Sequence, residues 1–128
     1  MMDTERWLVL SGVGLLAVAA LSGFVQHAYR EDARRFAEWR VVHAGGTAGA
    51  VQLIALAAVW HRVGSGGWPA LIAVGIVLAT FAFFAGPMAN ALGFRRTSRA
   101  LLGMGGLVAL PAYFALPLAF LVSAQGRP

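Results

Sequence analysis

The residues best suited to chemistry in this sequence are the few polar side chains that interrupt its apolar stretches, above all His43. Polar groups are costly at membrane depth, so they usually face the interior of a helical bundle. At about 100° per helical residue, one face carries His43, Gly46, Thr47 and Ala50. A neutral imidazole beside positions without bulky side chains suits a planar macrocycle whose metal the imidazole binds. The spacing therefore predicts a cofactor site in which His43 binds the metal and the other three residues contact the macrocycle.

A second group of polar residues is predicted deeper in the same apolar environment. Gln52, Thr80 and Tyr113 all lie roughly 18–21 Å from the arginine-rich ends of their helices, at a rise of about 1.5 Å per residue. Asn90 lies within the first turn or two of that end. Prolines in the last two apolar stretches are expected to bend the helices and turn Asn90 and Tyr113 inward. We therefore take Tyr113 and Asn90 as the candidate catalytic residues.

Helices that cross a membrane must position these side chains. Of the 128 residues, 59 % are hydrophobic and 12 % charged, whereas about a quarter of an ordinary soluble domain is charged. Four stretches are long and apolar enough to cross a hydrocarbon core of about 30 Å, approximately 7–29, 41–60, 68–94 and 100–124. The sequence predicts an all-α integral membrane protein, a single domain over 1–128 built as a four-helix bundle. This composition argues against a soluble enzyme and a nucleic-acid binder, and the absence of cysteine excludes thiolate metal sites.

The arginines predict an orientation in the membrane. Seven of the ten basic residues fall in the first and third connections, 30–40 and 95–99. By the positive-inside rule these connections are cytoplasmic and both termini face outward. We expect a multi-pass protein of a bacterial-type inner membrane whose surroundings are the lipid bilayer. The connection 30–40 is expected to be a solvated helical lead-in to the second span, with binding of a lipid headgroup or a partner as the alternative.

Three short motifs carry a family resemblance: RVVHAG at 40–45, IALAAV at 54–59 and LPAY at 110–113. On these motifs the sequence resembles the styrene oxide isomerase family of small four-helix membrane proteins. The resemblance implies a homotrimer that holds haem b at subunit interfaces, with His43 as axial ligand. It implies a ferric iron that acts as a Lewis acid on a small hydrophobic epoxide, giving a carbonyl compound by a Meinwald-type rearrangement. Two features depart from the family pattern. Gly49 stands where the family carries an asparagine, and the run ATFAFF at 79–84 stands where the family carries an acid and aromatic residues on its third helix.

Two other functions are open on the residues alone. His27 and His43 are expected at similar depth on the same side, so both could bind one iron in a bis-histidine haem protein that carries electrons. A cofactor-free membrane scaffold or assembly protein would have a comparable composition. Gly45 and Gly49 form a GxxxG motif, which favours self-association of helices, so we expect a homo-oligomer.

Overall fold

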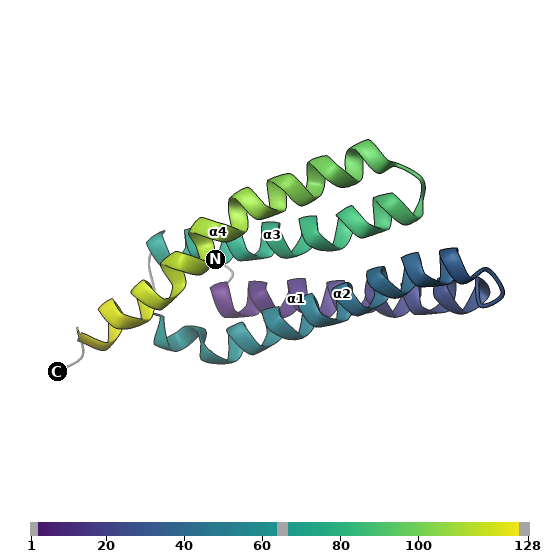
Figure 1. Ribbon diagram of the computed structural model, residues 1–128. Helices are drawn as coiled ribbons and strands as arrows, with labels where there is room; N and C mark the ends of the chain where they lie inside the picture. The colour runs from purple at the N-terminus through teal and green to yellow at the C-terminus, as the bar shows by residue number, and fades with distance from the viewer. Residues whose placement is uncertain (1–2, 64–66, 126–128) are drawn as a thin grey trace.

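The computed structural model describes residues 3–63 and 67–125 and contains, in that part of the chain, four long helices and one short one (Figure 1). They are α1 (Thr4–Ala28), α2 (Ala33–Val59), the 3-10 helix η1 (Trp60–Arg62), α3 (Gly67–Ala91) and α4 (Arg95–Gln125). Each of the four long helices has the length and apolar character needed to cross a membrane. The predicted all-α, four-helix membrane fold is confirmed.

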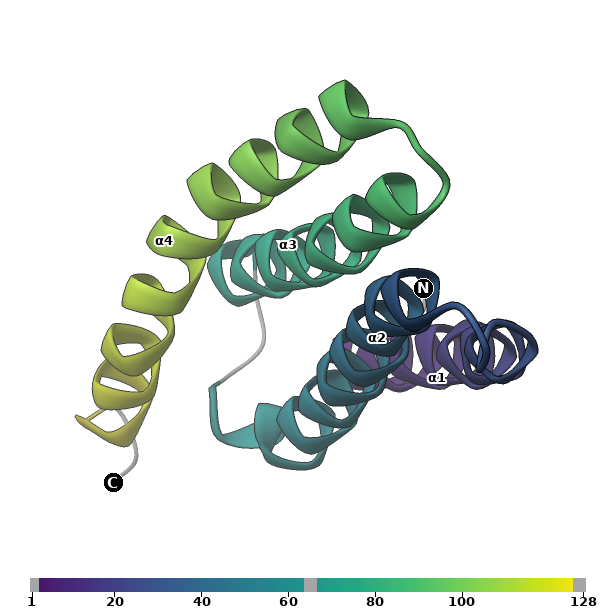
Figure 2. The same cartoon turned by 45° about the vertical axis from the view of Figure 1, so that its right-hand side comes forward.

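The helices are arranged as two hairpins. Among the described residues α1 packs mainly against α2, and α3 packs mainly against α4. The two hairpins contact each other mostly through α2 and α3. Of the elements that the structure describes, α3 and η1 are the only ones whose backbone comes close to that of α4. Figure 2 shows α4 on the far side of α3 from the first hairpin, bent so that its C-terminal part comes near η1, and the helix continues through Pro111 and Pro117 without a break. The bundle is therefore less closed around α4 than around the other three helices.

The first hairpin is shaped by a helix cap. The Asp32 carboxylate accepts hydrogen bonds from the backbone N–H groups of Arg34 at 3.1 Å and Arg35 at 3.0 Å. An N-terminal aspartate satisfies donors that the first helical turn leaves without partners. For this reason α2 begins well before its apolar stretch, and the basic segment after Asp32 is helical, as predicted.

The second hairpin turns at a glycine. Gly93 has a φ of +92°, its N–H donates to the carbonyl of Asn90, and the N–H of Phe94 donates to that of Ala89. This is the Schellman pattern that ends many helices. As a result α3 ends at Ala91 and α4 begins at Arg95, so the basic residues 95–99 form the first turn of α4 rather than a loop.

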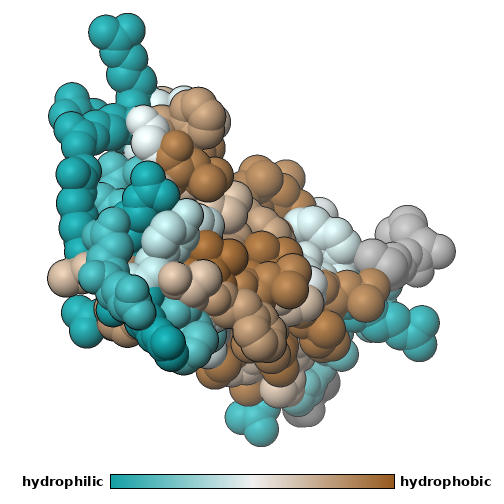
Figure 3. Space-filling model, turned by 90° about the vertical axis from the view of Figure 1, so that its right-hand side faces the viewer, coloured by the Kyte–Doolittle hydropathy of each residue, from teal (hydrophilic) through white to brown (hydrophobic). Residues whose placement is uncertain are grey.

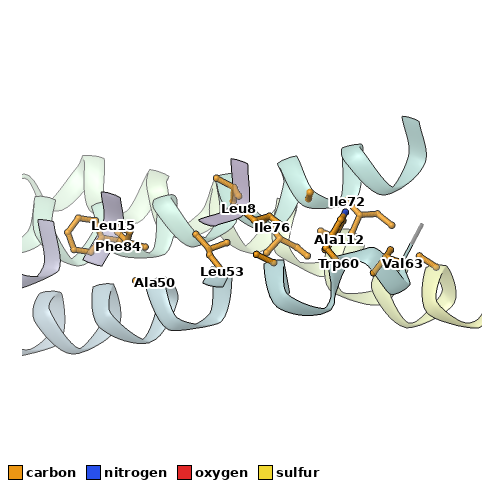
Figure 4. Close-up of a cluster of buried hydrophobic side chains, with 14 of the residues drawn as sticks. Leu8, Leu15, Ala50, Leu53, Trp60, Val63, Ile72, Ile76, Phe84 and Ala112 are labelled. Carbon is orange, nitrogen blue, oxygen red and sulfur yellow. The ribbon is translucent and has the colours of Figure 1, made fainter. Parts of the chain in front are cut away.

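The core lies between α1, α2 and α3 (Figure 4). Its largest fully buried side chains are Leu8, Leu15, Val42, Leu53 and Ile76. The buried hydrophobic residues of α4 are all alanines, whereas most of its large apolar side chains are exposed and a few, such as Leu116 and Phe120, are half-buried against the core. Small residues let two helices approach closely in a membrane, where large apolar side chains are as well accommodated by lipid. α4 therefore packs on α3 mainly through its small residues and presents most of its large ones outward.

Both arginine-rich connections lie at one end of the molecule. The α1–α2 and α3–α4 turns share that end, and α1 begins and α4 ends at the opposite one (Figure 1). This arrangement agrees with an even number of crossings, in which both connections reach the same membrane surface.

Candidate functional site

His43 is held by a main-chain group of the neighbouring helix. Its Nδ1 atom lies 2.7 Å from the carbonyl oxygen of Ala19 on α1. A carbonyl oxygen only accepts, so Nδ1 must carry the hydrogen and donate it. The neutral imidazole then keeps its lone pair on Nε2, the state in which a histidine binds a metal. The structure thus sets both the orientation and the tautomer of His43.

A glycine of α1 makes room for this ring. A Cβ atom at Gly23 would lie 3.1 Å from both Nδ1 and Cε1 of His43. Sequence reasoning did not single out Gly23 or the Ala19 carbonyl as part of the site. The available signal was the run of small residues near the end of α1, which allows the two helices to approach closely.

The open surface expected beside Gly46 and Ala50 is wrong for a single chain. Both positions are buried, and a Cβ at Gly46 would lie 2.7 Å from the Phe84 ring and 2.8 Å from the Ala19 methyl group. The space left by the absent side chain of Gly46 is filled by residues of α1 and α3 and not by a macrocycle. Whether these residues contact a cofactor stays a prediction, but in one chain their face is already filled.

The outward side of His43 is open. His43 itself is half-buried, Ala44 and Gly45 are exposed, and a Cβ at Gly45 would meet nothing within 4 Å. Thr47 is half-buried, and its hydroxyl donates to the carbonyl of His43 at 2.9 Å. Any flat group bound beside His43 would therefore lie toward this outer surface of α2, where lipid or another copy of the chain would cover it.

The GxxxG motif is divided between two environments. Gly45 faces outward, whereas a Cβ at Gly49 would lie 2.7 Å from Cγ2 of Thr80 and 3.4 Å from Cδ2 of Leu15. Gly49 is therefore used inside the molecule, where α2 approaches α3. The two glycines do not form one self-association face, because α1 and α3 already cover the side of α2 on which Gly49 lies.

Gln52 and Tyr113 meet across the molecule, as their predicted depth suggested. The Gln52 side-chain amide donates a hydrogen bond to the Tyr113 hydroxyl oxygen and so links α2 to α4. Tyr113 is partly exposed and lines an apolar hollow of about 180 Å³ with Ala109, Leu110 and Phe114. Thr80 does not join this pair, because its hydroxyl donates to the carbonyl of Ile76 in its own helix.

The candidate residues do not converge on one point within a single chain. Gln52 follows His43 by nine residues, which is about 13 Å along α2. Asn90 is exposed at the arginine-rich end, so the expected inward orientation of Asn90 is wrong. It stands in the last turn of α3, where the helix has already reached the polar end of the bundle. His27 is also exposed, in the last turn of α1.

Side chains alone do not form a metal cluster in the described part of the chain, where no three His, Cys, Asp or Glu residues gather. A haem needs no such cluster, because its ring nitrogens surround the iron and the protein supplies one axial histidine. His43 is therefore a donor suited to a macrocycle rather than to a bare ion.

These features first define a class, a small multi-pass membrane protein with a half-buried histidine whose Nδ1 atom is fixed by a neighbouring helix. Comparison with known families goes one step further. Residues 4–125, nearly the whole chain, match the family described as styrene oxide isomerase, and the chain therefore belongs to that family. No curated protein and no solved structure matches the chain. The predicted resemblance is confirmed, and the membership supports an epoxide isomerase in a membrane.

Proposed function

We propose that this protein is a haem b-dependent isomerase of small hydrophobic epoxides, with His43 as the axial ligand. The observation that carries the proposal is the hydrogen bond from His43 to the Ala19 carbonyl, which leaves Nε2 able to bind iron. Histidines that bind a metal through one ring nitrogen usually donate a hydrogen bond from the other nitrogen, and this bond orients the ring. Family membership supports the reaction class.

The position of His43 supports a cofactor shared between copies of the chain. The inner face beside Gly46 is filled by α1 and α3, whereas the outer surface around Ala44, Gly45 and Thr47 is open or half-open. A macrocycle on that surface would expose its far side unless a second chain covered it. This agrees with the homotrimer and the interfacial haem that the family resemblance implies.

The proposed reaction is an internal rearrangement. One carbon–oxygen bond of the epoxide breaks, one hydrogen moves from the carbon that keeps the oxygen to its neighbour, and a carbonyl forms. No atom is gained or lost and no net oxidation occurs. When bound, ferric haem would supply a Lewis acid for the epoxide oxygen. The chain supplies apolar surroundings that keep water from a carbocation-like centre.

Tyr113 is the candidate donor to the substrate oxygen. Because the Gln52 amide donates to the Tyr113 oxygen, the phenolic hydrogen is left to bind another acceptor. The small apolar hollow beside Tyr113 has the character expected for a hydrophobic substrate. Tyr113 lies deeper in the membrane than His43, and copies of the chain related by an axis along the membrane normal keep this difference, so Tyr113 would act on a substrate that extends from the cofactor toward the centre of the bilayer.

The first experiment is the absorbance spectrum of the protein, purified in detergent from cells that make haem. We expect a Soret band that is lost in His43→Ala and kept in His27→Ala, a control histidine at the exposed end of α1. No Soret band in the unaltered protein would contradict the haem proposal and favour the cofactor-free scaffold.

The second candidate is the bis-histidine electron carrier. His27 lies four residues after Gly23, and therefore on the side of α1 that touches the His43 ring. If both histidines bind one iron, the spectrum is low-spin and His27→Ala changes it. An isomerase needs an open position on the iron, so its spectrum is insensitive to His27→Ala.

We also propose that the arginine-rich end faces the cytoplasm of a bacterial-type cell. Seven arginines at that end, against one within each of α1 and η1, support this orientation.

A further inference from the structure

A polar hollow of about 360 Å³ lies at the arginine-rich end, between the start of α2 and the α3–α4 turn. Its polar lining comes from two distant segments, Asp32, Arg34, Arg35 and Glu38 on one side and Asn90 and Arg95 on the other. Figure 3, which looks onto this end, shows hydrophilic residues gathered along one side with apolar surface beside them. Neither His43 nor the Gln52–Tyr113 pair lines this hollow.

The charges in the hollow are only partly balanced. The Arg34 Nε atom pairs with Glu38 at 3.3 Å, and the Arg35 Nε atom lies 3.9 Å from a carboxylate oxygen of Asp32. Both acids are thus engaged on the α2 side. Arg95, on the opposite wall, has no acidic partner in the described part of the chain. Three arginines against two acids leave one positive charge in the lining.

The surroundings of the hollow match the boundary between lipid headgroups and acyl chains. The hollow lies where the two hairpins end, and Leu92 and Phe94, on either side of Gly93, are 55 % and 62 % exposed. Large apolar side chains next to Arg95 would be costly in water but are accommodated by acyl chains. Four further exposed arginines at this end, without an ion pair among the described residues, are Arg30, Arg40, Arg96 and Arg99.

We propose that this hollow binds the phosphate of an anionic phospholipid, with Arg95 as its principal cation. The Arg95 guanidinium and the Asn90 amide are donors suited to phosphate oxygens. The acyl chains would lie along Leu92 and Phe94. The surrounding excess of arginines favours a headgroup with a net negative charge over a zwitterionic one, because the ammonium group of the latter would be repelled. This site is independent of the proposed haem chemistry.

The test compares two single substitutions that remove the same charge. Arg95 lines the hollow, whereas the neighbouring Arg96 is exposed outside it. Binding of phosphatidylglycerol to the full chain in a neutral detergent is measured by native mass spectrometry. We expect Arg95→Gln to weaken binding about fivefold, the effect of one arginine near an anionic membrane surface, and Arg96→Gln to weaken it much less. Phosphatidylcholine should bind more weakly than phosphatidylglycerol.

Three outcomes would overturn the proposal. Equal losses in Arg95→Gln and Arg96→Gln would mean a diffuse attraction of the whole basic end rather than a site. Equal binding of phosphatidylcholine would remove the role of net charge. Displacement of phosphatidylglycerol by millimolar inorganic phosphate would assign the hollow to a soluble anion. Circular dichroism of both variants would identify a loss caused by misfolding, and Arg95→Lys, which keeps the charge, should retain binding.

Discussion

At the scale of single residues, the departure of this chain from its family pattern has a packing consequence. The family resemblance places an asparagine where this chain has Gly49, and here α2 and α3 approach each other at that glycine. The polar group that an asparagine would supply is therefore missing at this depth. Within the described residues, Gln52 and Tyr113 provide a polar pair one turn further along α2.

We predict that Gly49→Asn destabilises the protein by about 1–3 kcal/mol, because its Cβ would lie 2.7 Å from Thr80. Gly45→Asn is the matched control, since a Cβ there meets nothing within 4 Å. Thermal unfolding of both variants in one detergent measures the difference. Equal melting temperatures for the two variants would contradict the close approach at Gly49.

Tyr113 allows a prediction that separates chemistry from packing. If its hydroxyl donates to the substrate oxygen, Tyr113→Phe lowers kcat for styrene oxide by about 100-fold, the cost of losing one such donor, and leaves the Soret band unchanged. Gln52→Leu removes the same interhelical hydrogen bond but keeps the hydroxyl, so its loss should be smaller. Equal effects of both substitutions would mean that the bond serves only to join α2 and α4.

At the scale of helices, the α3–α4 turn depends on one backbone conformation. Gly93 has a φ of +92°, which a residue with a Cβ rarely adopts. Gly93→Ala should cost about 1–2 kcal/mol. Gly103→Ala is the control, because Gly103 lies inside α4 with no neighbour within 4 Å, and alanine there favours the helix. The two changes should therefore shift the melting temperature in opposite directions.

The helices themselves could be predicted because apolar length alone requires them, and the Asp32 cap explains why α2 begins early. What each face of a helix contacts could not be predicted from the sequence. Helical spacing correctly groups His43 with Gly46 and Ala50, but it cannot tell whether a cofactor or Phe84 fills the space beside them. The depth of Gln52 and Tyr113 along their helices correctly predicted that they meet. The exposure of Asn90 was not predicted, because it depends on where α3 ends.

At the scale of the whole molecule, the two arginine-rich turns must lie on one side of the membrane. Because the chain contains no cysteine, introduced thiols report on orientation without background. A thiol reagent that cannot cross membranes should label Asp3→Cys in intact cells and Thr97→Cys only after permeabilisation. Both native residues are exposed, at opposite ends of the bundle. The reverse labelling pattern would invert the proposed orientation.

The pairing of each helix with its sequence neighbour also has a consequence for biosynthesis. Contacts between segments close in sequence form early, because little loop-closure entropy opposes them. The α1–α2 pair is thus complete in the translated chain before α4 has left the ribosome. The α3–α4 pair closes last, because α4 is the last of the four helices to be translated, so until then lipid must cover the side of α3 that α4 later contacts.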